Sequence, residues 1–359
     1  AGNKADYGRT DEFTIDQSVP VLTVTYDNNE SSNEYYYSES RRAMLEVQEH
    51  NFVPEQFQVN VTADGTPVSG ISAWNSEGDR HTATVVFEND AEYTLEISGT
   101  DQAGNPVEAY GADRFIIDRT PPALEISRVS HHSANRGEVM PFIQVKDQHL
   151  DFEHFDVSLE GYRSLAQEIK GDSGKNADGM WIQMEDFSYT PETDDLYTLR
   201  ATASDLAGNQ SETSVTFSVN RFGSVYTLDE WTDAYYISEA KDIRITETNV
   251  DTLEFRKITC NWNGNLETLE EGKDYTVREN GSEDTWKQNE YVISRDNFKQ
   301  EGIYAVTVYS EDRAKNVSDN QSKGMTLAFA VDRTSPSVLI SGVKDRGKYR
   351  ESSREITID

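Results

Sequence analysis

The side chains of this sequence that could act as nucleophiles or metal ligands are few, and they form no catalytic set. The single cysteine, Cys260, lies in a strand-like stretch with no histidine near it in sequence, so we interpret it as a buried structural thiol. Four of the six histidines fall close together, at His131, His132, His149 and His154. Adjacent side chains on a strand point to opposite faces, so we interpret these histidines as solvated loop residues rather than zinc ligands. No Gly-x-Ser-x-Gly motif marks a serine nucleophile, and the sequence predicts a protein that is not an enzyme.

Carboxylates are so abundant that a pair of them carries no information about glycosidase chemistry. The 359 residues include 33 Lys+Arg and 65 Asp+Glu, for a formal charge of −32. This charge argues against nucleic-acid partners and anionic membrane surfaces, because both attract basic proteins. No cofactor is expected, but calcium held between units is an alternative that recurring polar residues leave open. Two sets of these residues could meet at junctions: Glu49, Asp101 and Asp118, and then Asp147, Asp205 and Asn220.

Aromatic clusters are the strongest indication of a ligand. The candidate ligand-facing side chains are Tyr35, Tyr37, Trp231 and Tyr235, which occupy similar places in two repeated units. Two interpretations stay open. A recurring tyrosine can be a core residue of a strand, or an exposed ring can stack on a sugar or anchor a protein partner.

An internal repeat organises the elements that position these residues. The pattern Asp-x-Ala-Gly-Asn occurs at 101–105 and 205–209, and a variant with lysine in place of glycine occurs at 312–316. A tyrosine precedes each copy by eight residues, and a Phe-x-x-Asp or Phe-x-x-Asn segment follows. The repeated positions are Tyr93, Tyr197, Tyr304, Asp101, Gly104, Asn105, Asp205, Gly208, Asn209, Asp312, Asn316, Asp118, Pro121, Pro122 and Pro336.

The repeat markers predict three complete units, at 19–120, 121–221 and 222–334. Residues 1–18 are expected to be the C-terminal strands of a preceding repeat, and residues 335–359 the N-terminal strands of a following one. The sequence is therefore expected to be a segment of a longer tandem array. The linker after Asn220 lacks proline, unlike the one after Asp118, so the junction after Asn220 is expected to be more flexible.

The strand evidence is a period-two alternation of apolar and polar residues, for example in 93–98 and 304–308. About seven short strands per hundred residues, with no helical periodicity, predict an all-β chain of two-sheet Greek-key sandwiches. The Asp-x-Ala-Gly-Asn segment lies between two strands and predicts a turn closed by the aspartate side chain. Lys315 replaces the turn glycine and must adopt a left-handed conformation unless that turn differs.

The combined pattern Tyr-x-[Leu/Val], Asp-x-Ala-Gly-Asn and Phe-x-[Val/Ile]-Asp-Arg-Thr-x-Pro resembles bacterial Ig-like repeats of large Gram-positive, clostridial-type cell-surface proteins. The resemblance covers essentially the whole chain. It implies tandem Ig-like sandwiches in an elongated array, extracellular and attached to the cell wall, acting as a stalk, a spacer or an adhesin.

Two alternative functions remain. One unit could bind a host glycan or protein directly, and the long insertion at 260–281 makes the third unit the candidate. The units could also be accessory, non-catalytic domains of a carbohydrate-active enzyme. The expected partners are a host protein or glycan, with no nucleic acid and no direct membrane insertion. Like-charge repulsion predicts that the rod is monomeric along its length.

Overall fold

The structure is a computed structural model that describes all residues except 1, 3–7, 9, 33 and 230–234. Trp231, one of the candidate aromatic residues, lies outside the described residues. The described part of the chain consists of β-strands, loops and three short 3-10 helices, η1 (Pro54–Gln56), η2 (Pro191–Thr193) and η3 (Arg295–Phe298). The prediction of an all-β chain is confirmed.

The first sandwich contains a four-stranded and a five-stranded sheet. The four-stranded sheet has the order β1 (Val21–Tyr26), β3 (Arg41–Gln48), β7 (Arg80–Phe87) and β6 (Asn75–Glu77). The five-stranded sheet has the order β2 (Tyr36–Tyr37), β9 (Tyr110–Ile117), β8 (Ala91–Gly99), β4 (Phe57–Ala63) and β5 (Thr66–Val68). Neighbouring strands are antiparallel except β2 and β9, which pair in parallel.

The second sandwich repeats this topology. Its four-stranded sheet has the order β10 (Ala123–Ser127), β12 (Phe142–Lys146), β16 (Gly179–Met184) and β15 (Gly171–Asn176). Its five-stranded sheet has the order β11 (Ser133–Asn135), β18 (Gln210–Val219), β17 (Asp195–Asp205), β13 (Leu150–Gly161) and β14 (Leu165–Gln167). The short strand β11 again pairs in parallel with its neighbour, β18.

The third sandwich adds one strand to the larger sheet. Its four-stranded sheet has the order β19 (Val225–Asp229), β21 (Ile243–Asn249), β25 (Lys287–Ile293) and β24 (Tyr275–Asn280). The larger sheet has the order β20 (Tyr236–Ile237), β28 (Leu327–Val331), β26 (Gly302–Asp312), β22 (Leu253–Trp262) and β23 (Asn265–Thr268), with β27 (Val317–Asp319) paired to β26. The insertion at 260–281 is thus the end of β22 together with β23 and β24 in the two sheets.

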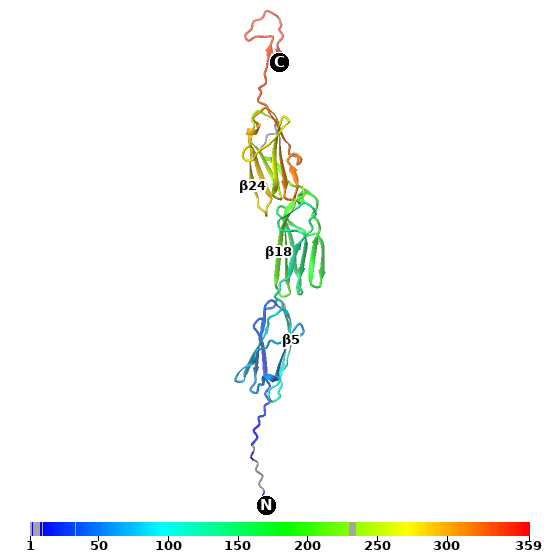
Figure 1. The fold of residues 1–359 in the computed structure, drawn as a ribbon, viewed down its shortest axis with the longest axis vertical. Helices are drawn as coiled ribbons and strands as arrows, with labels where there is room; N and C mark the ends of the chain where they lie inside the picture. The colour runs from blue at the N-terminus through cyan, green and yellow to red at the C-terminus, as the bar shows by residue number, and fades with distance from the viewer. Residues whose placement is uncertain (1, 3–7, 9, 33, 230–234) are drawn as a thin grey trace.

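The three sandwiches follow one another along a single long axis (Figure 1). Beyond the third, β29 (Ile340–Ser341) and β30 (Thr357–Ile358) form a small exposed antiparallel pair. Among the described residues before Val21, none is in a strand. Because residues 1, 3–7 and 9 lie outside the described residues, the strands expected within 1–18 remain a prediction. The unit boundaries at 19–120, 121–221 and 222–334 remain predictions.

The repeated tyrosine and phenylalanine meet in the core of each sandwich. The rings of Tyr93 and Phe115 stack 5.7 Å apart, and the corresponding pair in the third sandwich, Tyr304 and Phe329, stacks 5.5 Å apart. Each repeated tyrosine donates its hydroxyl proton to a backbone carbonyl four residues upstream, at 3.1 Å for Tyr93, 3.0 Å for Tyr197 and 2.9 Å for Tyr304. The ring fills the core while the hydroxyl ties down the preceding loop, which explains why this residue type recurs.

Cys260 lies in the core of the third sandwich, where burial raises the pKa of its thiol to about 11. A thiol with a raised pKa forms little thiolate, the nucleophilic form, at neutral pH. The interpretation of Cys260 as a buried structural residue is confirmed.

Replacing Lys315 with glycine is expected to stabilise the third sandwich. Lys315 has φ +69°, whereas Gly104 and Gly208 hold the same position of the first two copies with φ +89°. A side chain in this left-handed region costs about 1–2 kcal/mol, part of which the greater chain entropy of unfolded glycine offsets. We expect a net gain of about 0.5–1 kcal/mol in the free energy of unfolding, measured by hydrogen exchange of peptides from this sandwich.

The matched control is Gly104→Lys in the first sandwich. A Cβ at Gly104 would meet no atom within 4 Å, so the substitution tests the backbone conformation without a steric clash. It is expected to destabilise the first sandwich by about 1 kcal/mol. Equal stability of both variants and the wild type would contradict the backbone argument.

Candidate functional site

The Asp-x-Ala-Gly-Asn segment is a side-chain clasp as well as a turn. In the first copy, the backbone N–H of Asn105 donates to Asp101 Oδ1 at 2.8 Å, and Asn105 Nδ2 donates to Asp101 Oδ2 at 2.8 Å. The second copy has the same pair of bonds from Asn209 to Asp205, at 2.9 and 2.8 Å. The predicted turn, closed by the aspartate side chain, is confirmed.

The asparagine amide of each clasp also reaches the unit that precedes it. Asn105 Nδ2 donates to the backbone carbonyl of Asp16 at 3.2 Å, Asn209 Nδ2 to that of Asp118 at 2.8 Å, and Asn316 Nδ2 to that of Asn220 at 2.8 Å. The repeated motif therefore does two things: it closes a hairpin and holds the end of the previous unit against it. Of these two roles, the sequence predicted only the closing of the hairpin.

Around each clasp, five polar residues at equivalent repeat positions come together. We call these groups the first, second and third junction clusters. The first consists of Asp16, Glu49, Asn51, Asp101 and Asn105; the second of Asp118, Asp147, His149, Asp205 and Asn209; and the third of Asn220, Asn249, Asp251, Asp312 and Asn316.

The predicted grouping of the junction acids was wrong by one unit. Asp118 does not join Glu49 and Asp101, which meet Asp16 instead. It joins Asp147 of the following sandwich, because the last residue of one unit lies against the first loops of the next. The position held by Asn51, His149 and Asp251 was not predicted as part of a junction. The signal for it is the alignment of the blocks at 49–51, 147–149 and 249–251, in which each of these residues follows an acid or an amide by two positions.

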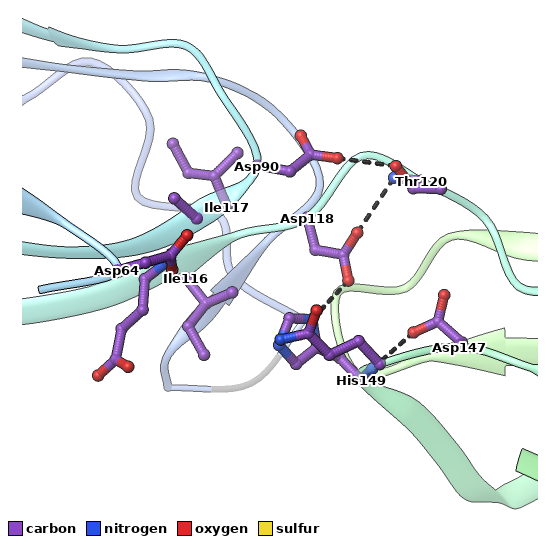
Figure 2. Close-up of a pocket in the computed structure, with 11 residues that line it drawn as sticks. Asp64, Asp90, Ile116, Ile117, Asp118, Thr120, Asp147 and His149 are labelled. Atoms are coloured by element: carbon purple, nitrogen blue, oxygen red, sulfur yellow. Dashed lines mark hydrogen bonds and ion pairs between the residues drawn. The ribbon is translucent and has the colours of Figure 1, made fainter. Parts of the chain in front are cut away.

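Three residues of the second junction cluster, Asp118, Asp147 and His149, line a pocket of about 330 Å³ between the first two sandwiches (Figure 2). His149 Nδ1 lies 2.7 Å from Asp118 Oδ2, and the backbone N–H of His149 donates to Asp147 Oδ1 at 2.6 Å. The ring of Tyr36 packs edge-on against His149. The interpretation of His149 as a solvated loop residue was therefore wrong, because the neighbouring unit covers it.

Negative charge is crowded in the second cluster. Asp118 and Asp205 are buried, and Asp147 is half-buried. Burial, with the nearby charges of Asp118 and Asp205, raises the pKa of Asp147 above its usual range. Burial, with a contribution from the Asp118 charge, likewise raises the pKa of Asp205. Both shifts mean that the ionised carboxylates are held in a site that disfavours their charge.

The third cluster relieves the same crowding with an amide. Asn220 replaces the aspartate of the other two junctions, and its Nδ2 donates to Asn249 Oδ1 at 2.9 Å, Asp251 Oδ2 at 2.9 Å and Asp312 Oδ2 at 3.0 Å. Asn220 and Asn249 are completely buried. One donor group thus stands at the centre of a ring of acceptor oxygens.

Asp251 gives the third junction a defined pH dependence. Burial, with the nearby Asp312 charge, raises the pKa of Asp251 above its usual 3.8. An acid with a raised pKa destabilises the folded state when ionised, and this penalty disappears as the pH falls through the folded pKa toward 3.8. We expect Asp251→Asn to raise the Tm of the third sandwich at pH 7, and the gain to shrink on acidification, in calorimetric scans at several pH values.

The asparagine retains an oxygen that can accept the bonds from Asn220 and Ser218, so geometry is preserved. The exposed acid Asp345 serves as the control, and Asp345→Asn is expected to leave the Tm unchanged at every pH. A gain in Tm for Asp251→Asn that grows on acidification would contradict a raised pKa for Asp251.

The linker of the third junction, which follows Asn220, is packed, and this contradicts the expectation that it is more flexible. Asn220, Arg221 and Ser224 are buried, whereas Arg119 and Pro121 of the first linker are exposed. Proline is absent here because backbone N–H groups are needed as donors. The N–H of Arg221 lies 2.9 Å from both oxygens of Asp194.

The Arg221 side chain anchors this linker from inside the second sandwich. Its guanidinium group is only 1% exposed and pairs with Asp186 at 2.5 Å. It also donates to the backbone carbonyls of Phe187, at 2.7 Å, and Gly137, at 3.2 Å. Sequence reasoning did not single out this arginine, since Arg119 and Arg333 precede similar linkers without being buried.

Further side chains cross both junctions. Between the first and second sandwiches, Ser32 Oγ donates to the backbone carbonyl of Ala207 at 2.6 Å. Between the second and third, Trp286 Nε1 donates to Asp195 Oδ1 at 2.6 Å, and the Arg163 guanidinium lies 3.5 Å from the centre of the Trp286 ring. Neighbouring sandwiches are therefore joined by specific contacts as well as by the chain.

The candidate ligand-facing aromatic residues have different environments. Tyr37 is buried in the first core, so it cannot face a ligand, and the core interpretation holds for this residue. Tyr35 is 56% exposed and Tyr235 is 44% exposed, so these two remain on the surface. Of the repeated prolines, Pro122 is buried, while Pro121 and Pro336 are exposed.

Two groups in the described residues have ligand atoms close enough to share a metal ion. They are Asp16, Glu49 and Asp101 of the first cluster, and Asp118, Asp147 and His149 of the second. Within the described residues, no helix is long and apolar enough to cross a membrane.

Two family models match parts of the chain. Residues 158–221 match the model described as a bacterial Ig-like domain, and residues 221–337 match the Sgo0707 N2 domain. No curated protein matches the sequence.

Several solved structures are similar to the chain. A tetra-tandem repeat from the extending region of a large adhesion protein is 16% identical over 90% of this chain and 77% of its own, with a TM-score of 0.41. The full ectodomain of mouse nectin-like molecule 4 is 11% identical over 79% of this chain and 93% of its own, with a TM-score of 0.40. A pair of tandem Ig domains of titin is 12% identical over 59% of this chain and 95% of its own, with a TM-score of 0.29. The chain is an all-β array of tandem Ig-like sandwiches, and residues 158–221 of it are similar to a bacterial Ig-like domain.

Proposed function

We propose that this chain is a non-catalytic spacer of a bacterial cell-surface protein, extracellular and attached to the cell wall, which carries a distal function away from the surface. The observation that carries the proposal is the end-to-end order of three sandwiches with specific side-chain contacts at both junctions (Figure 1). A spacer must hold its length, and a junction that buries polar side chains resists bending better than a free linker does.

The chemistry of the chain supports the same function. The formal charge of −32 keeps parallel rods apart in a crowded surface layer. The one thiol is buried, so it is shielded from oxidants and from disulfide exchange outside the cell. The polar residues that come together at the junctions are used to hold neighbouring units.

Small-angle X-ray scattering of the full chain tests the proposal. Three sandwiches of about 35–40 Å each give a rod of about 120 Å, for which the radius of gyration is about 35 Å. A compact globule of this length would have about 21 Å. We expect the rod value, and a narrow distance distribution that broadens when a Gly-Ser segment is inserted after Thr120. A compact particle, or no change on insertion, would contradict a stiff spacer.

A direct adhesin is the second candidate, and exposed aromatic side chains favour it. Tyr235 and Tyr236 of the third unit are 44% and 70% exposed, with ring centres 5.0 Å apart. Such rings can stack on a sugar or enter a protein pocket. A glycan and matrix-protein array probed with the full chain and with Tyr236→Ser separates the two functions. Binding that the variant loses supports the adhesin, and no binding by the full chain supports the spacer.

Accessory domains of a carbohydrate-active enzyme are the third possibility. Such accessory domains would share this fold and would differ in being joined to a catalytic domain. A catalytic domain in the same reading frame would favour this function over the spacer.

A further inference from the structure

The second junction cluster places three metal-ligating side chains from two sandwiches around one point. One ligand atom from each of Asp118, Asp147 and His149 lies within 4.8 Å of the others. Two ligands on opposite sides of an ion at about 2.1–2.4 Å are about 4.2–4.8 Å apart, so small side-chain rotations bring all three to a common ion. The adjoining pocket leaves room for water ligands (Figure 2).

The third cluster, built from the equivalent repeat positions, has a hydrogen-bond donor at this point. There, the amide nitrogen of Asn220 occupies the centre of the ring and donates to Asn249, Asp251 and Asp312. At the second junction the equivalent residue is Asp118, and an ionised carboxylate cannot donate. Asp118, Asp147 and Asp205 give this cluster three carboxylates, whereas Asp251 and Asp312 give the third cluster two. The second cluster thus has no amide at its centre, and its carboxylates share the ring of His149, whose Nδ1 lies 2.7 Å from Asp118 Oδ2 and which holds the position of Asp251.

The protein itself supplies little positive charge to this site. Among the described residues that line the pocket, none is a lysine or an arginine, whereas Asp64, Asp90 and Glu92 add further carboxylates. Arg119, the nearest arginine in sequence, pairs with Asp90. His149 contributes at most one positive charge against the carboxylates of Asp118, Asp147 and Asp205.

We propose that the second junction binds a divalent cation of the zinc class through Asp118, Asp147 and His149. An imidazole with two carboxylates suits a borderline metal such as Zn²⁺, whereas Ca²⁺ and Mg²⁺ prefer oxygen ligands alone. Asp118 belongs to the end of the first unit, and the other two ligands belong to the opening loops of the second. The ion ties the two units together, while the third junction performs the same task with an amide.

Titration calorimetry of the full chain, freed of metal with EDTA and then dialysed, tests the proposal with Zn²⁺, Ca²⁺ and Mg²⁺ as separate probes. We expect one Zn²⁺ site whose affinity exceeds that for Ca²⁺ or Mg²⁺ at the same site. His149→Asn and Asp118→Asn are each expected to weaken Zn²⁺ binding at least tenfold. The control, His154→Asn, removes an exposed histidine paired with Asp151 outside the cluster, and it is expected to leave the affinity unchanged.

Asp118→Asn also tests whether a loss of Zn²⁺ binding comes from misfolding. It places at the second junction the residue type that Asn220 provides at the third. Its Tm in EDTA should equal or exceed that of the wild type, and Zn²⁺ should raise the Tm of the wild type alone. The proposal is overturned if the wild type binds no Zn²⁺, if both cluster variants bind it as tightly as the wild type, or if the cluster prefers Ca²⁺. These outcomes are independent of the rod length, so they do not decide the spacer function.

Discussion

Replacing Arg221 with alanine is expected to lower the free energy of unfolding of the second sandwich by about 2–4 kcal/mol. The guanidinium group is buried, so its loss leaves the carbonyls of Gly137 and Phe187 without a donor. It also leaves Asp186, which accepts a hydrogen bond from the backbone of Val139, without its counter-charge. Hydrogen exchange with mass spectrometry measures this loss unit by unit in the full chain.

The repeat provides a matched control at the same motif position. Arg119 follows Asp118 as Arg221 follows Asn220, but its side chain is 46% exposed and its partner Asp90 is 35% exposed. Exposed ion pairs contribute little, so Arg119→Ala is expected to cost less than about 1 kcal/mol. Similar losses from the two substitutions would show that burial of Arg221 does not govern the stability of the linker after Asn220.

Replacing Asn220 with aspartate is expected to destabilise the third junction by about 3–5 kcal/mol. The substitution removes the amide that donates to three acceptors and adds a buried charge beside Asp251 and Asp312. The loss should diminish on acidification, because protonation of the introduced carboxyl removes the added charge. Calorimetry from pH 7 to pH 4 measures the loss, and scattering should show a broader distance distribution at pH 7.

Asp332→Asn is the control for this second prediction. Asp332 ends the third unit at the equivalent repeat position, and it is exposed. Changing it is expected to alter stability by less than about 0.5 kcal/mol. A loss on Asn220→Asp that stays constant with pH would mean that lost packing, and not charge, is responsible.

The repeat-derived parts of the structure could be predicted because they depend on local patterns. Alternating residues such as those of β8 and β26 place one face in the core, and the repeated tyrosines mark the same place in each sandwich. The turn at 101–105 was predictable because its bonds join residues four apart. The left-handed conformation of Lys315 followed from its alignment with Gly104 and Gly208.

The junctions could not be predicted in the same way, because their contacts join residues of different units. Asp118 and Asp147 carry the same charge, and nothing local says which acid meets which across a linker. His149 looked solvated because the unit that covers it lies far upstream in sequence, with Tyr36 against its ring.

The sequence by itself determined the all-β fold, the repeat and the residues that close each hairpin, since these depend on spacing along one strand or turn. Only the tertiary structure decided that the same repeat positions form three chemically different junctions. The reason is electrostatic and steric. Whether a carboxylate is acceptable at a junction depends on the burial and charge that the next unit brings to it, which makes Asp118 part of a candidate cation site and Asn220 a self-sufficient clasp.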